Sequence, residues 1–228
     1  DRSLVFEKCG DVYRKSGDYQ KAIDNYSAAL SAWQESVQDT GPEYVPWVIT
    51  RVSRNSNLCR KISISHEQAS NYDEAYSWIN KAVEYLPADS ENTAPRVYAA
   101  KSGILRRKGA FEDSVLWGER ATAIAVQSGN PRDIAYSHNI LANTFIEMGQ
   151  LQDAVQHLKK SVAISEQEQD FIGISTANNN LGACYMYQDN LDNAITHYKV
   201  ALDADTKMQN DAMMAIDYNN LGEAYIMQ

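Results

Sequence analysis

The chain has 228 residues, with 21 Lys and Arg against 30 Asp and Glu, for a formal net charge of −9. This acidic balance argues against nucleic acid as a direct partner. No apolar run reaches the length of a membrane-spanning helix and no signal peptide is visible, so we expect no membrane association and a cytoplasmic location.

The acidic surplus is concentrated in the second half. Residues 1–120 carry 16 basic against 17 acidic residues, net −1, whereas residues 121–228 carry 5 against 13, net −8. The three cysteines are scattered and odd in number, and no Cys-x-x-Cys pair occurs. This pattern predicts buried free thiols rather than a disulfide framework or a metal site.

The chain begins with two helical segments joined by a turn. Residues 3–16 are expected to form the first helix, Ser16-Gly17-Asp18 the turn, and residues 19–36 the second helix. A turn-rich connector follows at 38–47 and leads into a long helix over about 47–69. Because Tyr44, Val45 and Trp47 would otherwise form an exposed apolar patch, we expect the connector to pack back onto the chain.

The same helical hairpin recurs along the rest of the chain. Small residues stand three positions after an aromatic residue or leucine at five places, spaced by 53, 39, 40 and 40 residues: Ala22, Ala75, Ser114, Ala154 and Ala194. A sixth unit opens at Asn220-Leu221-Gly222. The expected repeats cover residues 3–36, 47–87, 95–128, 132–168, 172–208 and 212–228. Helix-favouring composition throughout predicts an all-α fold.

Residues 178–202, NNNLGACYMYQDNLDNAITHYKVAL, show the unit most clearly. Its spacing, L-G-x-x-Y followed by A-x-x-x-aromatic-x-x-A, resembles the tetratricopeptide repeat (TPR). The period of about 40 residues is similar to the long-period arrays of kinesin light chains and of bacterial signalling regulators of the maltose-activator type. The resemblance implies a right-handed superhelical solenoid and a single array over 1–228. Since the chain starts at Asp1 and stops within a repeat, we expect it to be a piece of a larger protein.

No motif points to catalysis. Phosphate-binding, dinucleotide-binding, zinc-protease and serine-hydrolase patterns are all missing from the sequence, so we expect neither an enzyme nor a bound cofactor or metal. His157 and His197 lie 40 residues apart at matching positions, which favours repeat equivalence and surface exposure over a metal pair. His66 takes a packing position and is expected to be partly buried.

In the TPR family, the first helices of the hairpins line a concave groove, and the matching positions can be read from this sequence. Asn139, Asn179 and Asn219 recur there at 40-residue intervals, with Asn180 and Asn220 beside the last two. This is similar to the asparagine ladders of O-GlcNAc transferase and kinesin light chains, which implies contact with a peptide backbone. The alternative is that these side chains tie one repeat to the next.

The rest of the predicted groove changes character along the chain. Basic residues cluster on the first helices of repeats 2 and 3: Arg60, Lys61, Arg96, Arg106 and Arg107. The alternative for these is pairing with Glu67 or Glu112. Polar and apolar residues complete the stripe in repeats 4 and 5: Tyr136, Asn143, Ile146 and Met186.

Together these features predict a protein–protein interaction module that holds an extended peptide or a partner helix in the groove. The expected partner is acidic at one end and apolar at the other. The alternatives are a regulatory or sensor arm of a larger signalling regulator, and a targeting arm of an enzyme whose catalytic part lies elsewhere. Repeat 6 has no second helix to cover Leu221, Tyr225 and Ile226, so we also expect self-association or fraying at 216–228.

Overall fold

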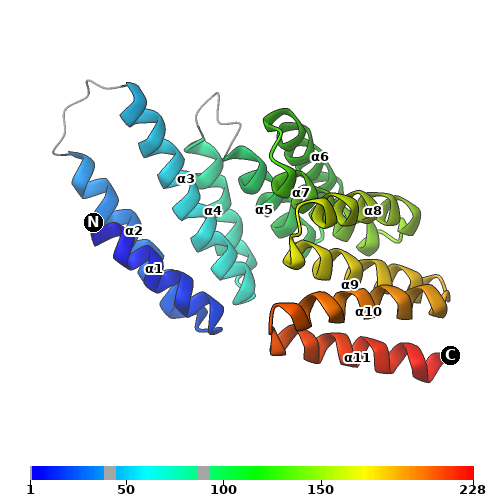
Figure 1. Cartoon of the computed structure of the whole chain (residues 1–228). Helices are drawn as coiled ribbons and strands as arrows, with labels where there is room; N and C mark the ends of the chain where they lie inside the picture. Colours follow the sequence, from blue (N-terminus) through cyan, green and yellow to red (C-terminus); the bar gives the residue numbers. More distant parts are fainter. Residues whose placement is uncertain (1, 39–44, 87–92) are drawn as a thin grey trace. The chain divides into compact units, whose positions relative to one another are not determined.

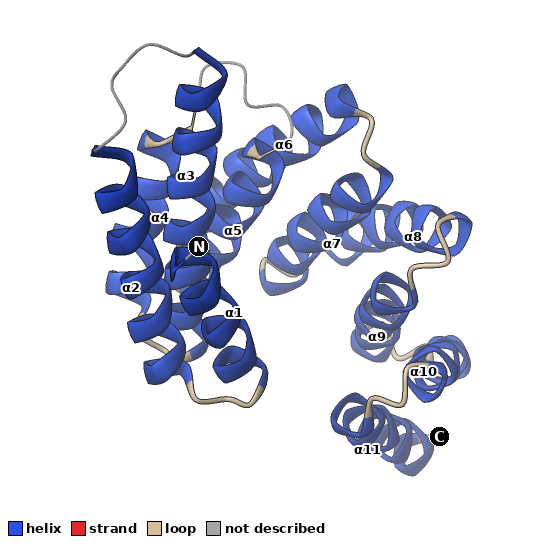
Figure 2. Cartoon of the chain, turned by 60° about the vertical axis from the view of Figure 1, so that its left-hand side comes forward, coloured by secondary structure: helices blue, strands red, loops and turns tan. Residues whose placement is uncertain are grey.

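Figure 1 shows a computed structural model of the whole chain, which describes residues 2–38, 45–86 and 93–228, with side chains over 2–36, 53–86 and 93–228. Within these ranges every regular element is a helix, so the all-α prediction is confirmed (Figure 2). The chain divides into two compact units, Asp1–Ala110 and Phe111–Gln228. The boundary falls in the turn of the predicted third repeat. A single array over 1–228 stays a prediction, as does the right-handed sense of the superhelix.

The first unit contains five helices among its described residues. They are α1 (Arg2–Lys15), α2 (Tyr19–Gln38), α3 (Val45–Gln68), α4 (Tyr72–Glu84) and α5 (Ala94–Arg107). Helix α2 packs against both α1 and α3, and α4 packs against α3 and α5. The expected packing of the connector concerns Tyr44 and the side chains of Val45 and Trp47, which lie outside the described part of the chain.

The second unit contains six helices. They are α6 (Phe111–Ser128), α7 (Pro131–Glu147), α8 (Leu151–Gln167), α9 (Phe171–Tyr187), α10 (Leu191–Lys207) and α11 (Asp211–Met227). Within the unit, consecutive helices pack against each other, and α7 also contacts α9. Figure 1 shows α9, α10 and α11 side by side. The helix bounds agree with the predicted repeats to within a few residues.

The turns follow from residues that tolerate a left-handed backbone. Glycines at positive φ end several of the helices: Gly17, Gly109, Gly129 and Gly149. In the turn between α9 and α10, Asp189 takes the same region with φ of 57°. Asn130 then caps α7, where its side-chain oxygen accepts from the amides of Arg132 and Asp133, and Pro131 occupies the first turn.

In two of the hairpins, close contact between the helices depends on a glycine that faces a tyrosine. A Cβ added at Gly10 would lie 2.6 Å from the Tyr26 ring, and one at Gly182 would lie closer still to the Tyr198 ring. The predicted small anchors Ala22, Ala75, Ser114, Ala154 and Ala194 are all fully buried. The sequence spacing therefore identified the packing positions correctly.

The glycines give a direct test of this packing. Gly182→Ala should destabilise unit 2 by about 1–3 kcal/mol, since the new methyl group must displace the Tyr198 ring. Gly222 occupies the matching position in α11, where nothing lies within 4 Å of an added Cβ. Gly222→Ala should therefore stabilise the helix by about 0.5–1 kcal/mol. Chemical denaturation of both variants checks this, and equal effects at the two sites would contradict the packing account.

Candidate functional site

The groove asparagines form hydrogen bonds from one first helix to the next. Asn180 donates from Nδ2 to Asn139 Oδ1 at 3.0 Å, which links α9 to α7. Asn220 donates in the same way to Asn179 Oδ1 at 3.1 Å, which links α11 to α9. The two bonds are equivalent, one repeat apart, and both join residues 41 positions apart. The asparagines thus tie repeat to repeat, which was the alternative left open by the sequence.

These bonds still leave polar groups available for a ligand. Because Asn139 accepts through Oδ1, its amide orientation is fixed, and no described residue accepts a hydrogen bond from its Nδ2. Asn219 is exposed on α11 and has no hydrogen bond within the described chain. Asn179 has less capacity to spare, because its Nδ2 also donates to Asp217 Oδ1 at 2.6 Å.

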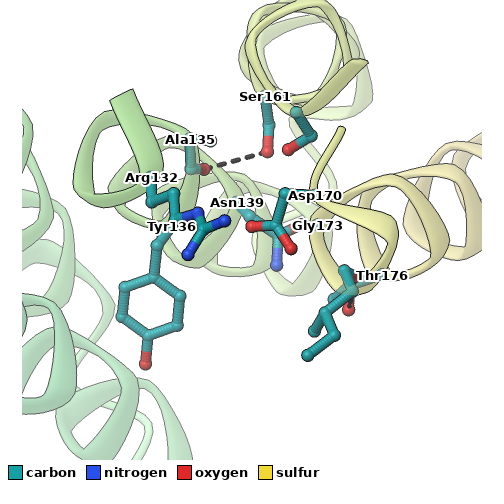
Figure 3. Close-up of a pocket in the computed structure, with 10 residues that line it drawn as sticks. Arg132, Ala135, Tyr136, Asn139, Ser161, Asp170, Gly173 and Thr176 are labelled. Carbon is teal, nitrogen blue, oxygen red and sulfur yellow. Dashed lines mark hydrogen bonds between the residues drawn. The ribbon is translucent and has the colours of Figure 1, made fainter. Parts of the chain in front are cut away.

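A pocket of about 160 Å³ opens where α7, α8 and the start of α9 meet. Its lining residues are Arg132, Ala135, Tyr136, Asn139, Ser161, Ser165, Asp170, Ile172, Gly173 and Thr176. Figure 3 shows the Arg132 guanidinium, the Asp170 carboxylate and the Asn139 amide directed toward one another. Ser161 donates to the Ala135 carbonyl at 2.9 Å and holds α8 against α7 at the back of the pocket. Gly173 is needed here, since a Cβ would collide with Ser165.

The other predicted groove residues of unit 2 differ in how far they are available. Tyr136 is exposed beside the pocket. Ile146 and Met186 are half-buried and pack against the two apolar cores of the unit. Asn143 is also half-buried. The apolar part of the predicted stripe therefore contributes both to the core and to the surface.

The basic residues of unit 1 largely face acidic or polar partners within the same unit. Lys61 pairs with Glu7 at 2.9 Å and with Asp11 at 2.7 Å. Arg60 donates to Asn57 at 2.7 Å. Burial raises the pKa of Glu67, while Arg106 and Arg107 act in the opposite direction. Arg107 lies 3.9 Å from Glu67, as the alternative interpretation expected. Arg96 is exposed.

The hydrogen-bonded asparagines of α7, α9 and α11 are here called the asparagine ladder: Asn139, Asn180, Asn179 and Asn220. A buried pair of carboxyl groups at the end of this ladder was not predicted. Asp205 on α10 and Asp217 on α11 are 1% and 0% exposed. Ser175 donates to Asp205 Oδ2, and Asn179 donates to Asp217 Oδ1. Asp205 Oδ1 and Asp217 Oδ2 are buried without a further hydrogen bond, and a proton shared between the two carboxyls would satisfy both. Burial and the Asp205 charge raise the pKa of Asp217 to about 6.

The repeat alignment contained a signal for this pair. Asp217 takes the core position that Ala177 and Ser137 hold in the preceding repeats, and Asp205 takes that of Ser165. An ionisable residue at an otherwise small core position is uncommon unless it has a partner. The pocket residues Arg132 and Asp170 were missed for a different reason, since they lie at helix starts outside the stripe.

The expectation that His157 and His197 are surface residues is wrong. Both are half-buried, because each bonds a residue of the preceding helix: His157 Nδ1 lies 2.9 Å from His138 Nδ1, and His197 Nδ1 lies 2.8 Å from Asn178 Oδ1. His157 and His197 are indeed repeat equivalents. His66 is half-buried as predicted, and burial lowers its pKa.

The cysteines are unpaired, as predicted. Cys59 and Cys184 are buried, and burial raises their pKa values to about 12 and about 11, whereas Cys9 is only half-buried. Over the part of the chain that the structure describes, no group of three or more His, Cys, Asp or Glu is placed to hold a metal ion. None of the helices in that part is both long and apolar enough to cross a bilayer.

Three segments of the chain match a known repeat family. A profile described as "Tetratricopeptide repeat" matches residues 8–32, 135–168 and 175–207, which include the repeats that carry the asparagine ladder and the pocket. These segments of the chain are tetratricopeptide repeats. No curated protein sequence matches it.

Solved structures support the fold assignment. The TPR chain is similar to BtubC (BKLC) from P. vanneervenii, with 16% identity and a TM-score of 0.73 over 92% of this chain and 84% of that one. It is also similar to a Rap protein complexed with Competence and Sporulation Factor, with 15% identity and a TM-score of 0.79 over 99% of this chain and 63% of that one. A STAND protein with a TPR sensor from Pyrococcus horikoshii shares 12% identity at a TM-score of 0.69, over 98% of this chain and 32% of its own. At these identities the likeness establishes the helical repeat fold.

The His138–His157 pair should make unit 2 sensitive to acid. Burial, followed by the His157 and Lys160 charges, lowers the pKa of His138 from 6.5 to about 4. Between these values the unfolded chain binds more protons than the folded one, so the free energy of unfolding should fall as pH drops from about 6.5 toward 4. His138→Asn reproduces the Asn178–His197 pair of the next repeat and should flatten this dependence. Denaturation curves from pH 7 to pH 4 measure it, and identical slopes for the two proteins would refute the assignment.

The Asp205–Asp217 pair should have the opposite effect on the pH dependence, because it makes the free energy of unfolding fall as the pH rises. The pKa of Asp217 is raised from 3.8 to about 6, so the folded state binds more protons in that range, and its contribution to stability is lost as pH rises through about 6. Asp217→Asn should raise the free energy of unfolding by about 1–3 kcal/mol at pH 7.5. The reason is that the asparagine amide donates to the otherwise unpaired Asp205 oxygen at every pH. Asp189→Asn, in an exposed turn, is the matched control. Equal stability of Asp217→Asn and wild type at pH 7.5 would argue against a shared proton.

Proposed function

We propose that unit 2 binds an extended peptide, or a partner helix, along the first-helix face of α7, α9 and α11. TPR repeats support a protein-interaction role, and the geometry of this face suggests where the contact occurs. The interaction consists of hydrogen bonds to the ligand backbone and one side chain held in the pocket beside Asn139. The residues that carry it on this chain are Asn139, Asn219, Tyr136 and Thr176.

The observation that carries this proposal is the fixed Asn139 amide. Its oxygen accepts from Asn180, and no described residue accepts a hydrogen bond from its nitrogen, although Asn139, which lines the pocket, is only 7% exposed. A peptide carbonyl placed there would accept a hydrogen bond without any rearrangement of the ladder. Since the donor is already oriented, little conformational entropy is lost on binding.

The pocket favours a ligand side chain of intermediate polarity. Arg132 and Asp170 bring one positive and one negative charge to the same space, so neither a cation nor an anion is strongly selected. Ile172 and the Tyr136 ring add apolar surface. A volume of about 160 Å³ corresponds to about five water molecules at ~30 Å³ each, which suits one side chain rather than a whole peptide.

The predicted groove is basic in unit 1 and more apolar in unit 2, and the expected partner is acidic at one end and apolar at the other. The apolar surface of Tyr136, Ile146 and Met186 favours an apolar segment on unit 2. An acidic segment on unit 1 would need to compete with Glu7, Asp11 and Glu67 for the basic side chains there. We therefore propose the contact on unit 2 as the stronger of the two.

A regulatory or sensor arm of a larger protein is the second candidate. Two of the structures with this fold are described as a Rap protein complexed with a factor and as a STAND protein with a TPR sensor. The chain spans 63% and 32% of those proteins, which leaves room in such proteins for other domains. Binding without catalysis in the cytoplasm fits both the peptide-binding module and the sensor arm. No separate observation supports a targeting arm of an enzyme.

A random peptide library tests the groove directly. The tightest-binding peptide should lose affinity for Asn219→Ala by about 1–3 kcal/mol, because a desolvated peptide group is left unpaired while the fold keeps all its described bonds. Asn179→Ala should lose affinity and stability together, since it also breaks the bonds to Asp217 and Asn220. Binding is measured by calorimetry at low and high salt, and the amide effects should persist in both.

The control is Gln156→Ala, which removes an exposed amide from α8, a second helix of unit 2. It should bind the peptide like the wild type. If Asn219→Ala binds normally while Gln156→Ala does not, the groove assignment is wrong.

A further inference from the structure

The pocket between α7, α8 and α9 contains two opposite charges that do not pair with each other. The Arg132 guanidinium and the Asp170 carboxylate both line it and are directed toward one another (Figure 3). Within the described part of the chain, neither side chain forms an ion pair or a hydrogen bond. The two charges therefore leave space between them for a group that bonds both.

The Asp170 carboxylate is not used to cap its own helix. Asp170 precedes α9 as its N-cap residue, where an aspartate commonly accepts from the first amides of the helix, yet its side chain makes no such bond. Asn130, at the same place before α7, does accept from the amides of Arg132 and Asp133. The carboxylate of Asp170 thus stays available in the pocket.

The two charges are not a requirement of the repeat. Forty residues later, Ile172 and Asn210 take the positions of Arg132 and Asp170, and α9, α10 and α11 form without either charge. The formation of a hairpin therefore does not explain the pair. Its place on the wall of a pocket points to a ligand instead.

A ligand group between these charges must accept a hydrogen bond on one side and donate one on the other. A carboxylate would accept from Arg132 but meet the like charge of Asp170, and a cation would meet the reverse problem. A hydroxyl group has both functions on a single atom, which would have to reach both side chains at once. A carboxamide has its oxygen and its NH2 group on two arms of one planar group, so each arm can face one charge. Both hydrogen bonds are then strengthened by a charged partner.

We propose that the pocket selects a primary carboxamide, namely the side chain of a glutamine or an asparagine in the bound peptide. The carboxamide oxygen accepts from Arg132, its NH2 group donates to Asp170, and the methylene carbons lie against Ile172. Asn139 donates to the peptide backbone as in the proposed function, on which this inference rests. The volume of about 160 Å³ suits one such side chain.

Small molecules of one shape and different charge test the pocket. Propionamide is neutral, propionate is an anion and propionamidinium is a cation, and each is titrated into the isotope-labelled protein. The NMR signals of the Gly173 and Thr176 backbone amides report binding at the pocket. Propionamide should bind about tenfold more tightly than either ion, because each ion meets one like charge. N-methylpropionamide, in which a methyl group replaces one donor hydrogen, should also bind more weakly.

Removing either charge should change which molecule binds most tightly. In Asp170→Asn the positive charge is left alone, so propionate should become the tightest of the three, whereas Arg132→Gln should favour propionamidinium. Neither side chain bonds the described chain, so both variants should unfold at the wild-type temperature. Glu168→Gln and Lys159→Gln make the same changes in net charge at exposed residues outside the pocket. These two controls should keep the preference for propionamide.

A peptide library separates this inference from the proposed function. Peptides selected on the wild type should share a glutamine or an asparagine at one position. Replacing it with glutamate should weaken binding to the wild type about tenfold, and should not weaken binding to Asp170→Asn.

The inference is overturned if propionamide leaves the pocket signals unchanged, or if another of the four molecules binds the wild type as tightly. It is also overturned if the preference is the same in the Arg132 and Asp170 variants. Selected peptides that depend on Asn219 but share no glutamine or asparagine would overturn it and leave the proposed function standing. If no peptide binds, the proposed function fails, and the titrations with small molecules still decide the selectivity of the pocket.

Discussion

The close approach of paired helices is the constraint on which this structure depends. Where Gly10 meets Tyr26 and Gly182 meets Tyr198, the glycine has no room for a side chain and the ring is buried against the opposite backbone. In these two hairpins, that contact sets the distance between the first and the second helix. It also fixes the faces that each first helix leaves uncovered.

The asparagine ladder adds hydrogen bonds between first helices to the packing within each hairpin. Since Asn180 and Asn220 donate to the asparagines of the preceding first helix, neighbouring repeats are held in register by side chains of the groove itself. Asn139 therefore serves both the alignment of the repeats and the proposed ligand contact. The buried Asp217 extends the connection, because it accepts from Asn179 and carries a raised pKa. Protonation at the end of the ladder and the orientation of groove amides are physically linked through one hydrogen bond.

The sequence predicted the helices, the turns and the small anchors because these depend on spacing within one hairpin. Ala154 and Ala194 can be recognised by their distance from Leu151 and Leu191 alone. The ladder partners could not be predicted in this way, since the bond from Asn180 to Asn139 depends on the offset between two helices from different repeats. The same holds for the pairing of His157 with His138 and of Asp205 with Asp217, where burial and side-chain direction decide the contact. The identity of the ligand is a further step, because one fold serves many partners.

Photo-crosslinking gives the most direct test that the first-helix face of unit 2 is the binding surface. A photoreactive phenylalanine analogue would replace Tyr136, which is exposed beside the pocket, and in a second protein Gln156 on α8. Each protein is irradiated with the tightest peptide from the library, and the adducts are mapped by mass spectrometry. The account predicts an adduct at position 136 and none at 156. An adduct at 156 with none at 136 would place the ligand on the second helices and contradict the assignment of the groove.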